Sequence, residues 1–383
     1  MTLFGKYRSH LPFAVWLLFA MLAMLLLPTS CIMDDGSGDV APDTDTGVQV
    51  GLRISLGTPA GAARVPAGDY DDATATAYEN FIDIENGGYR VLFFDMDDRY
   101  LASFEPQKFT ALGADRLTSK TYEVEGKISA DMPSNFKVVV LANWPTYPQN
   151  LVRGVTSVAD ICNDDNARFS YRSVYQLSLS ELIPMYGIKE CTNVTFRDKL
   201  TVPIGTVHLL RAMAKVEVLC TEGAWTIEDV KIHNYNGFGY CAPADVFNEA
   251  DYVRYDYALD FNTNIHIPTG ASMAEASLSL GEVAPGHFVI YVPEYQNTLN
   301  GTDIADKATL GIRFRKRTDK EYSVDFKYYQ SPSADVAQGT PFDIRRNYDY
   351  RFVVNKLEEE AELNLNVDVL PYNQYDLYPE FGQ

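Results

Sequence analysis

A chain of 383 residues with 46% apolar and 22% charged residues has the composition of a globular protein, and its length predicts two domains. The formal net charge of −20 repels nucleic acid and anionic membrane surfaces, so we exclude nucleic acid as a partner. The 25 Tyr and 20 Phe residues favour strands over helices.

The N-terminus has the pattern of an export signal. Lys6 and Arg8 form a basic start, residues 11–27 are an uncharged apolar run, and small residues precede Cys31. These features predict a secretory signal peptide over residues 1–30. A Cys after small residues resembles the lipobox of bacterial lipoproteins, in which the thiol is acylated and becomes the new N-terminus. An uncleaved transmembrane helix is the alternative, although 17 residues lie at the short limit for spanning a bilayer.

A tether, a strand and a long loop are expected next. Residues 34–47 are polar and rich in Gly, Asp and Thr, which is the composition of a flexible linker and predicts a tether over residues 31–47. Over residues 48–56 every second residue is apolar, which predicts a half-buried strand. Residues 57–76 show no periodicity and predict an exposed loop, in which Arg64 is the only basic residue.

Short strands are expected along the rest of the chain. They are predicted at 89–94, 100–104, 136–141, 194–196, 207–220, 225–233, 288–292, 310–314, 322–328, 348–354 and 363–369, with one short helix at 178–186. Many short strands with few helices indicate β-sandwiches. We therefore expect a mainly β protein with two tandem sandwich domains, over residues 48–203 and 204–383.

The last predicted strand has one fully apolar face. Leu363, Leu365, Val367 and Val369 alternate with polar residues, and a charged stretch precedes them. A strand of this kind needs an apolar groove, either in its own domain or in another molecule.

Four cysteines follow the expected lipidation site: Cys162, Cys191, Cys220 and Cys241. An exported protein enters a compartment that permits disulfides, and four cysteines allow three connectivities. Pairing between sequence neighbours would keep one bridge in each half, and free buried thiols are the alternative. The chain has no Cys-x-x-Cys motif, which argues against a zinc ribbon or a thioredoxin-like site.

The sequence contains no recognisable catalytic motif. It lacks a Gly-x-Ser-x-Gly elbow, a His-Glu-x-x-His helix and a P-loop. Its histidines have no metal-ligand spacing, and its Asp clusters do not follow the pattern of a calcium loop. We therefore expect a protein that is not an enzyme and that needs no cofactor or metal.

Four short runs together resemble the fimbrillin family, the subunits of type V pili. They are YENFI at 78–82, VVVLANWP at 138–145, LRAMAKVEV at 210–218 and RNYDY at 346–350. The resemblance implies transthyretin-like β-sandwiches that reach the outer membrane as lipoproteins and build adhesive surface fimbriae. It also implies that an Arg-specific protease removes the first strand, and that a strand of another subunit fills the groove left behind.

The resemblance assigns roles to particular residues of this chain. Cys31 is the lipidated residue, Arg64 the maturation cleavage site, residues 48–56 the removable strand and residues 363–369 the donor strand. The implied partners are other fimbrial subunits, the protease, and the outer membrane through the lipid anchor, with no ligand assigned. Arg64 as an ordinary loop arginine and pairing of 363–369 within its own domain stay open. The alternative function is that of a monomeric surface glycan-binding lipoprotein.

Overall fold

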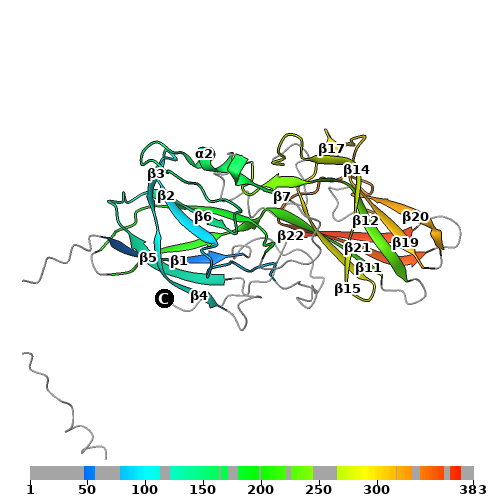
Figure 1. The fold of residues 1–383 in the computed structure, drawn as a ribbon, viewed down its shortest axis with the longest axis horizontal. Coiled ribbons are helices and arrows are strands. Elements are labelled where there is room, and N and C mark those ends of the chain that lie inside the picture. Colours follow the sequence, from blue (N-terminus) through cyan, green and yellow to red (C-terminus); the bar gives the residue numbers. More distant parts are fainter. Residues whose placement is uncertain are drawn as a thin grey trace, which may run out of the picture. The chain divides into compact units, whose positions relative to one another are not determined.

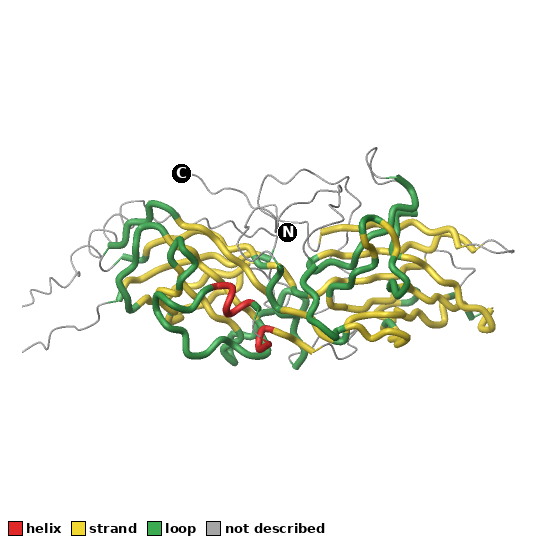
Figure 2. Tube along the Cα trace, turned by 90° about the horizontal axis from the view of Figure 1, so that it is seen from above, coloured by secondary structure: helices red, strands yellow, loops and turns green. Residues whose placement is uncertain are grey.

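The computed structural model shows a protein made almost entirely of strands (Figures 1 and 2). It describes residues 47–56, 78–112, 121–163, 165–170, 180–197, 200–220, 226–244, 265–315, 317–329, 337–357 and 363–371. All of these belong to one compact unit, Thr46–Gln383. Among the described residues helical structure is limited to short turns, and none has the length and apolarity of a membrane-crossing segment.

The first sandwich consists of two sheets. One has the order β4-β5-β1-β9 and the other the order β10-β8-β6-β2-β3. The strands are β1 (Val48–Ser55), β2 (Tyr89–Phe94), β3 (Tyr100–Ser103), β4 (Glu105–Leu112), β5 (Thr121–Ile128), β6 (Phe136–Ala142), β8 (Met185–Cys191), β9 (Val202–His208) and β10 (Leu210–Arg211). Side chains of both sheets meet in one hydrophobic core, called here the first core.

The second sandwich has sheets of order β15-β16-β11-β21-β22 and β14-β12-β19-β20. Its strands are β11 (Met213–Cys220), β12 (Ile227–Asn236), β14 (Ser272–Ser279), β15 (Gly281–Ala284), β16 (His287–Pro293), β19 (Thr309–Phe314), β20 (Arg317–Asp325), β21 (Tyr348–Leu357) and β22 (Leu363–Pro371). They enclose a separate second core. The short elements are α2 (Val158–Cys162), η2 (Asp165–Ala167), β7 (Arg168–Ser170), β13 (Phe238–Tyr240), β17 (Thr298–Leu299) and β18 (Thr302–Asp303).

The two sandwiches repeat one topology. In chain order β1, β2, β3, β4, β5, β6, β8 and β9 correspond to β11, β12, β14, β15, β16, β19, β20 and β21, and each hydrogen-bonded pair among the first eight has its counterpart among the second. The correspondence includes the parallel pairing of β1 with β9 and of β11 with β21. Within the described residues, β22 extends the second sandwich beyond this shared plan.

Mostly apolar runs form the central strands. All residues of β6 and of β16 are buried, as expected for strands covered on both faces. Strand β5 escapes notice in the sequence because Gly126 interrupts its alternation. A Cβ atom there would lie 2.3 Å from the carbonyl oxygen of Glu105, so the close approach of β4 requires glycine.

The predicted long strand over residues 207–220 is wrong. The chain there makes the end of β9, the short β10 and then β11, which belong to three different sheets. The breaks are stabilised by hydrogen bonds from Leu209 N to Ser55 O at 2.7 Å and from Ala212 N to Pro184 O at 2.8 Å. Strand β9 spans residues 203 and 204, the domain boundary expected from the sequence, and pairs with β1.

The helix predicted at 178–186 and the strand predicted at 194–196 are also wrong. The described residues 180–186 form a turn, a bridge and the start of β8, and residues 194–196 are irregular. Pro184 lacks an N–H to donate, and Tyr186 is needed for pairing with Leu141. The short helix α2 was not predicted; its signal is the capping box in which Ser157 and Asp160 bond each other's backbone N–H.

The close approach at Gly126 leads to a test of stability. The substitution Gly126→Ala should lower the free energy of unfolding by about 1–3 kcal/mol, because the backbone of β4 must move. In the control Gly51→Ala, on the neighbouring strand, the added Cβ meets side-chain atoms only, the Thr201 methyl group at 3.2 Å and Glu125 Cγ at 4.0 Å, and the substitution should be nearly neutral. Urea unfolding measures both variants, and equal losses would contradict this account of β5.

Candidate functional site

Strand β1 lies in the middle of a sheet. It pairs antiparallel with β5 along its whole length, from Val48 opposite Ile128 to Ser55 opposite Thr121. On its other side it pairs parallel with β9, with one irregularity between Gly51 and Arg53. The first strand of the described chain therefore has both backbone edges bonded, and its loss would leave unpaired N–H and C=O groups on two neighbours.

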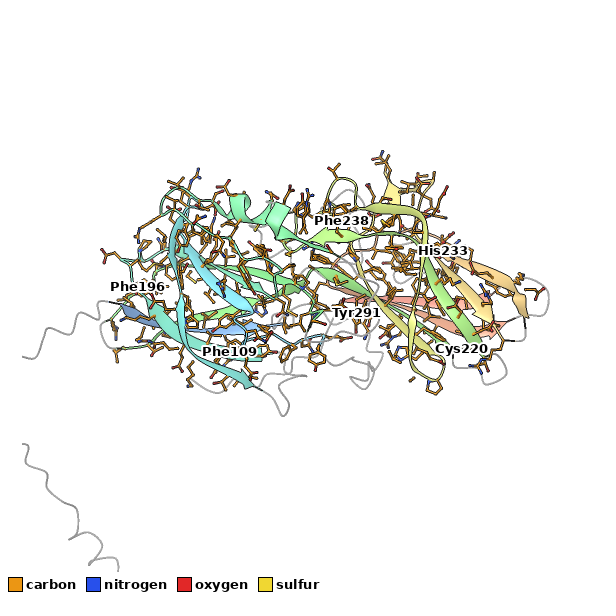
Figure 3. All side chains as sticks on the ribbon, in the orientation of Figure 1. Phe109, Phe196, Cys220, His233, Phe238 and Tyr291 are labelled. Atoms are coloured by element: carbon orange, nitrogen blue, oxygen red, sulfur yellow. The ribbon has the colours of Figure 1, made fainter. Side chains whose placement is uncertain are left out.

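The inward face of β1 fills the first core. Val50 and Ile54 are fully buried and Leu52 is 4% exposed, while Arg53 points outward and pairs with Glu123. The burial of these three aliphatic side chains contributes a gross stabilisation of about 5–9 kcal/mol. Across the sheet, the ring of Tyr122 lies 5.0 Å from that of Phe109 on β4 (Figure 3). Without β1 the sandwich would contain an apolar groove between β5 and β9.

The two residues with the most specific predicted roles lie outside the described residues. Cys31 belongs to the segment before residue 47, and Arg64 to the segment 57–77 that follows β1. The ends of this second segment are well defined. Leu56 is buried in the first core, and the chain is described again from Tyr78, where the next residues are buried.

Glu79 and Asn80 are held by buried polar contacts. Arg211 is fully buried and donates from Nε to the Glu79 carbonyl oxygen at 3.1 Å, and from Nη2 to Asn80 Oδ1. Tyr122 of β5 donates its hydroxyl to the Asn80 carbonyl oxygen at 2.6 Å. Asn347 accepts from Arg211 Nη1 at 3.1 Å. The chain just after the Arg64 segment is thereby anchored independently of β1.

The Glu79 side chain joins this turn to the second sandwich. Its carboxylate lies 3.1 Å from Lys215 Nζ on β11 and accepts a hydrogen bond from the Tyr291 hydroxyl on β16. Lys215 Nζ also lies 2.7 Å from Glu217 Oε1, and Arg351 Nε donates to Glu217 Oε2 at 2.8 Å. Buried charges need several partners of this kind, because an isolated one is costly.

The ionisation of this group follows from its burial. Burial alone would lower the pKa of Lys215, but the carboxylates of Glu79, Asp349 and Glu217 outweigh it and raise that pKa. Burial and the adjacent Glu217 carboxylate raise the pKa of Asp349, so Asp349 retains its proton to higher pH than usual.

The runs that resemble the fimbrillin family meet at this place. YENFI supplies Glu79 and Asn80, LRAMAKVEV supplies Arg211 and Lys215, and RNYDY supplies Asn347. From VVVLANWP, the Asn143 side chain donates to the Phe81 carbonyl oxygen at 2.7 Å and accepts from Asp83 N at 3.1 Å. We call Glu79, Asn80, Arg211, Lys215, Tyr291 and Asn347 the junction cluster. The four runs contain most residues of the junction cluster, but the roles expected from the sequence fall on other residues.

Strand β22 pairs within its own domain in this structure. It runs antiparallel to β21, from Tyr348 opposite Pro371 to Leu357 opposite Leu363. Among the described strands β21 is its one neighbour, so β22 forms the edge of its sheet. An edge strand can leave with fewer hydrogen bonds broken than a central strand such as β1.

None of the four described cysteines is part of a disulfide in this structure. Cys162, Cys191 and Cys241 belong to the first core, and Cys220, at the end of β11, packs against the second (Figure 3). The described residues also hold no cluster of His, Cys, Asp and Glu able to bind a metal ion.

The fold is similar to that of solved fimbrial proteins. The tip fimbrial protein Mfa3 of Porphyromonas gingivalis, solved with a C-terminal truncation, matches with a TM-score of 0.54 and 15% identity, over 85% of this chain and 100% of that chain. A fimbrilin (fimA) of Porphyromonas gingivalis gives 0.45 and 13%, over 86% and 99%. A fimbrial assembly protein of Parabacteroides distasonis gives 0.42 and 17%, over 85% and 100%. No family model and no curated protein matches the sequence. The match to the tip protein shows that this chain has a fimbrial-protein fold.

The buried Asp349 predicts a specific pH dependence. Because its pKa is raised in the folded state, the stability that its proton provides is complete at about pH 4 and is lost as the pH rises toward the folded-state pKa. Asp349→Asn should match the wild type at pH 4 and exceed it by at least about 1 kcal/mol at pH 7. Thermal unfolding between pH 4 and 8 measures the gap. The exposed Asp319→Asn is the control for charge alone, and parallel curves for wild type and Asp349→Asn would disprove the assignment.

Proposed function

We propose that this chain is a structural subunit of adhesive cell-surface fimbriae, assembled by protease-triggered β-strand exchange. The observation that supports the proposal is the position of β1. It is a central strand that fills an apolar groove, in a chain with a fimbrial-protein fold, and it is followed by a segment that holds Arg64.

Cleavage after Arg64 would separate β1 from the rest of the chain. The strand would then be held by its pairing and packing alone, while the junction cluster keeps the new N-terminal segment in place. An eight-residue strand spans about 26 Å. The empty groove would present unpaired backbone and apolar side chains over that length, and both are satisfied by an added strand.

Strand β22 of a second subunit is the proposed donor. Its nine residues suffice for the length of the groove, and Leu363, Leu365, Val367 and Val369 supply an apolar face of period two. It is an edge strand in its own sheet among the described residues, so its release breaks one ladder of hydrogen bonds. A central strand in the acceptor gains two ladders, which favours exchange.

Export and anchoring complete the proposal. Residues 1–30 are the signal peptide, Cys31 is acylated, and the lipid holds the subunit at the outer membrane until an Arg-specific protease cuts at Arg64. Lipid attachment by two or more acyl chains gives a stable anchor, whereas one chain does not. The partners are other fimbrial subunits, and the surface to which the fimbria adheres is left unassigned.

Limited proteolysis tests the cleavage step. The exported protein is treated with a trace of an Arg-specific protease and followed by mass spectrometry and size exclusion. We expect one early cut after Arg64, loss of the fragment that contains β1, and a ladder of oligomers. Arg64→Lys should resist the cut and stay monomeric. A fragment that remains bound, or a cleaved protein that remains a monomer, contradicts strand exchange and favours a monomeric glycan-binding lipoprotein.

Paired substitutions test the donor strand. Val367→Asp places a charge on the apolar face of β22, and Asn366→Asp places the same charge on the polar face. After cleavage, Val367→Asp should abolish the ladder, because an unpaired buried carboxylate is too costly, and Asn366→Asp should leave it intact. Equal effects of the two variants would show that β22 does not enter the groove.

A further inference from the structure

The inward face of β1 changes in side-chain size along the strand. It carries two smaller residues first and two larger ones after them: Val48, Val50, Leu52 and Ile54. Val48 packs against the first core, and the other three are buried in it. Cores tolerate replacements that conserve volume, whereas overfilled and underfilled sites are destabilising. A strand that replaces β1 therefore fits best with small side chains near residue 48 and larger ones near residue 54.

The apolar face of β22 has the opposite order of sizes. Its two leucines come first and its two valines last: Leu363, Leu365, Val367 and Val369. Entry in the direction of β1 would put leucines at the two valine sites and valines at the two larger sites. A shift by two residues in that direction still leaves the sites of Val50 and Ile54 mismatched. Entry in the opposite direction puts valines at residues 48 and 50 and leucines at residues 52 and 54.

Strand β5, one wall of the vacated groove, carries charged residues on its outward face. Lys127 lies beside the start of β1, and Glu123 lies opposite Arg53 near its end. Arg53 Nη2 is 2.9 Å from Glu123 Oε1, and this basic partner would leave with β1. Glu125, between them, would keep Lys108 of β4, whose Nζ is 3.1 Å from its carboxylate. The groove would thus have a basic residue at one end and an acidic one toward the other.

The polar face of β22 fits this wall in the same opposite direction. The residues between its apolar ones are Asn364, Asn366 and Asp368. In this direction Asp368 faces Lys127, and opposite charges across a pair of strands are favourable. The two asparagine amides face Glu123 and Glu125 and can donate N–H groups to these carboxylates. In its own sheet Asp368 lies opposite Arg351, so the exchange replaces one basic neighbour by another.

Entry in the direction of β1 gives poorer polar contacts. In the unshifted register Asp368 would lie opposite Glu123, and like charges directly opposite each other are destabilising. In the register shifted by two residues it would take the site of Ser55, which is 3% exposed, and a buried carboxylate is costly. Backbone pairing does not decide the direction, because either one gives one parallel and one antiparallel ladder, with β5 and β9. Size and charge therefore select the same direction.

We propose that β22 of a second copy of this chain fills the groove of β1 in the direction opposite to β1, with Asp368 facing Lys127. The donor then runs parallel to β5 and antiparallel to β9. Asn366 takes the place of Gly51, where an added Cβ meets side-chain atoms only. The proposal rests on the strand exchange inferred above, and it adds the direction of the donor and the contacts that select it.

Zero-length cross-linking of the assembled oligomers decides the direction. A mixture of nitrogen-15-labelled and unlabelled exported protein is cleaved by the Arg-specific protease. The resulting ladder of oligomers is treated with a carbodiimide, which joins a carboxylate to an adjacent amine, and is then digested with trypsin. We expect peptide 121–137, uncut at Lys127, to be linked to peptide 357–383 through Asp368. Linked pairs that combine a labelled with an unlabelled peptide show that the link joins two subunits.

Two controls accompany the cross-link. The uncleaved monomer should lack it, because Asp368 lies opposite Arg351 in its own sheet. Lys127→Arg keeps the charge and should form oligomers without the link. Oligomers in which Asp368 is linked to Lys120, or in which no link to Lys127 forms, overturn the direction while strand exchange stands. If no oligomers form, strand exchange itself is refuted, and this proposal with it.

Charge reversal gives an independent readout. Lys127→Glu and Asp368→Lys should each speed the dissociation of the oligomers in urea about two- to fivefold, because like charges then face each other. The double variant restores opposite charges and should dissociate at nearly the wild-type rate, which a purely structural role of Lys127 would not produce. Slower dissociation of Asp368→Lys, as pairing with Glu123 would require, or a double variant that shows the losses of both single variants, overturns the proposal.

Discussion

The pairing of β1 on both edges is the constraint on which the rest of the structure depends. A strand in the middle of a sheet satisfies the backbone groups of two neighbours, and this one also fills the core with three aliphatic side chains. An empty position there would leave unpaired backbone groups on β5 and β9 and expose apolar side chains of the first core. If the proposed cleavage removes β1, the same unpaired backbone groups and apolar side chains would favour the binding of another strand in its place.

The junction cluster holds the chain after residue 77 in place through hydrogen bonds and ion pairs that involve no residue of β1. Buried ion pairs contribute little net stability, since desolvation offsets most of the attraction between the charges. Buried ion pairs instead fix the relative positions of the segments that carry them, because the two charged groups can pair in few geometries. Glu79 and Asn80 fix the segment after residue 77 to β5, β10 and β11, so the loss of β1 need not disturb the remaining strands.

Much of the strand content could be predicted because half-buried strands alternate visibly. The range 48–56 matches β1 to within one residue, and 89–94 matches β2. The run 207–220 was predicted as one strand because its apolar residues continue to alternate across β9, β10 and β11, which belong to three sheets. Alternation shows which residues face a core, but it does not show which sheet a residue joins. Strand β5 was not predicted because Gly126 interrupts its alternation, and glycine is required there by the close approach of the Glu105 backbone on β4. The contacts of Arg211 were beyond prediction because they join residues more than 130 positions apart.

The repeated topology has a consequence for polymer polarity. The counterpart of β1 in the second sandwich is β11, which is covalently continuous with β10 on one side and β12 on the other. The proposed cut at Arg64 would separate β1 from the rest of the chain, but it would leave β11 covalently joined on both sides. Each subunit that assembles by exchange then offers one acceptor groove and one donor strand. Contacts of this heterologous kind give an unbranched filament with distinct ends, in which growth at one end exposes the same surface after every addition.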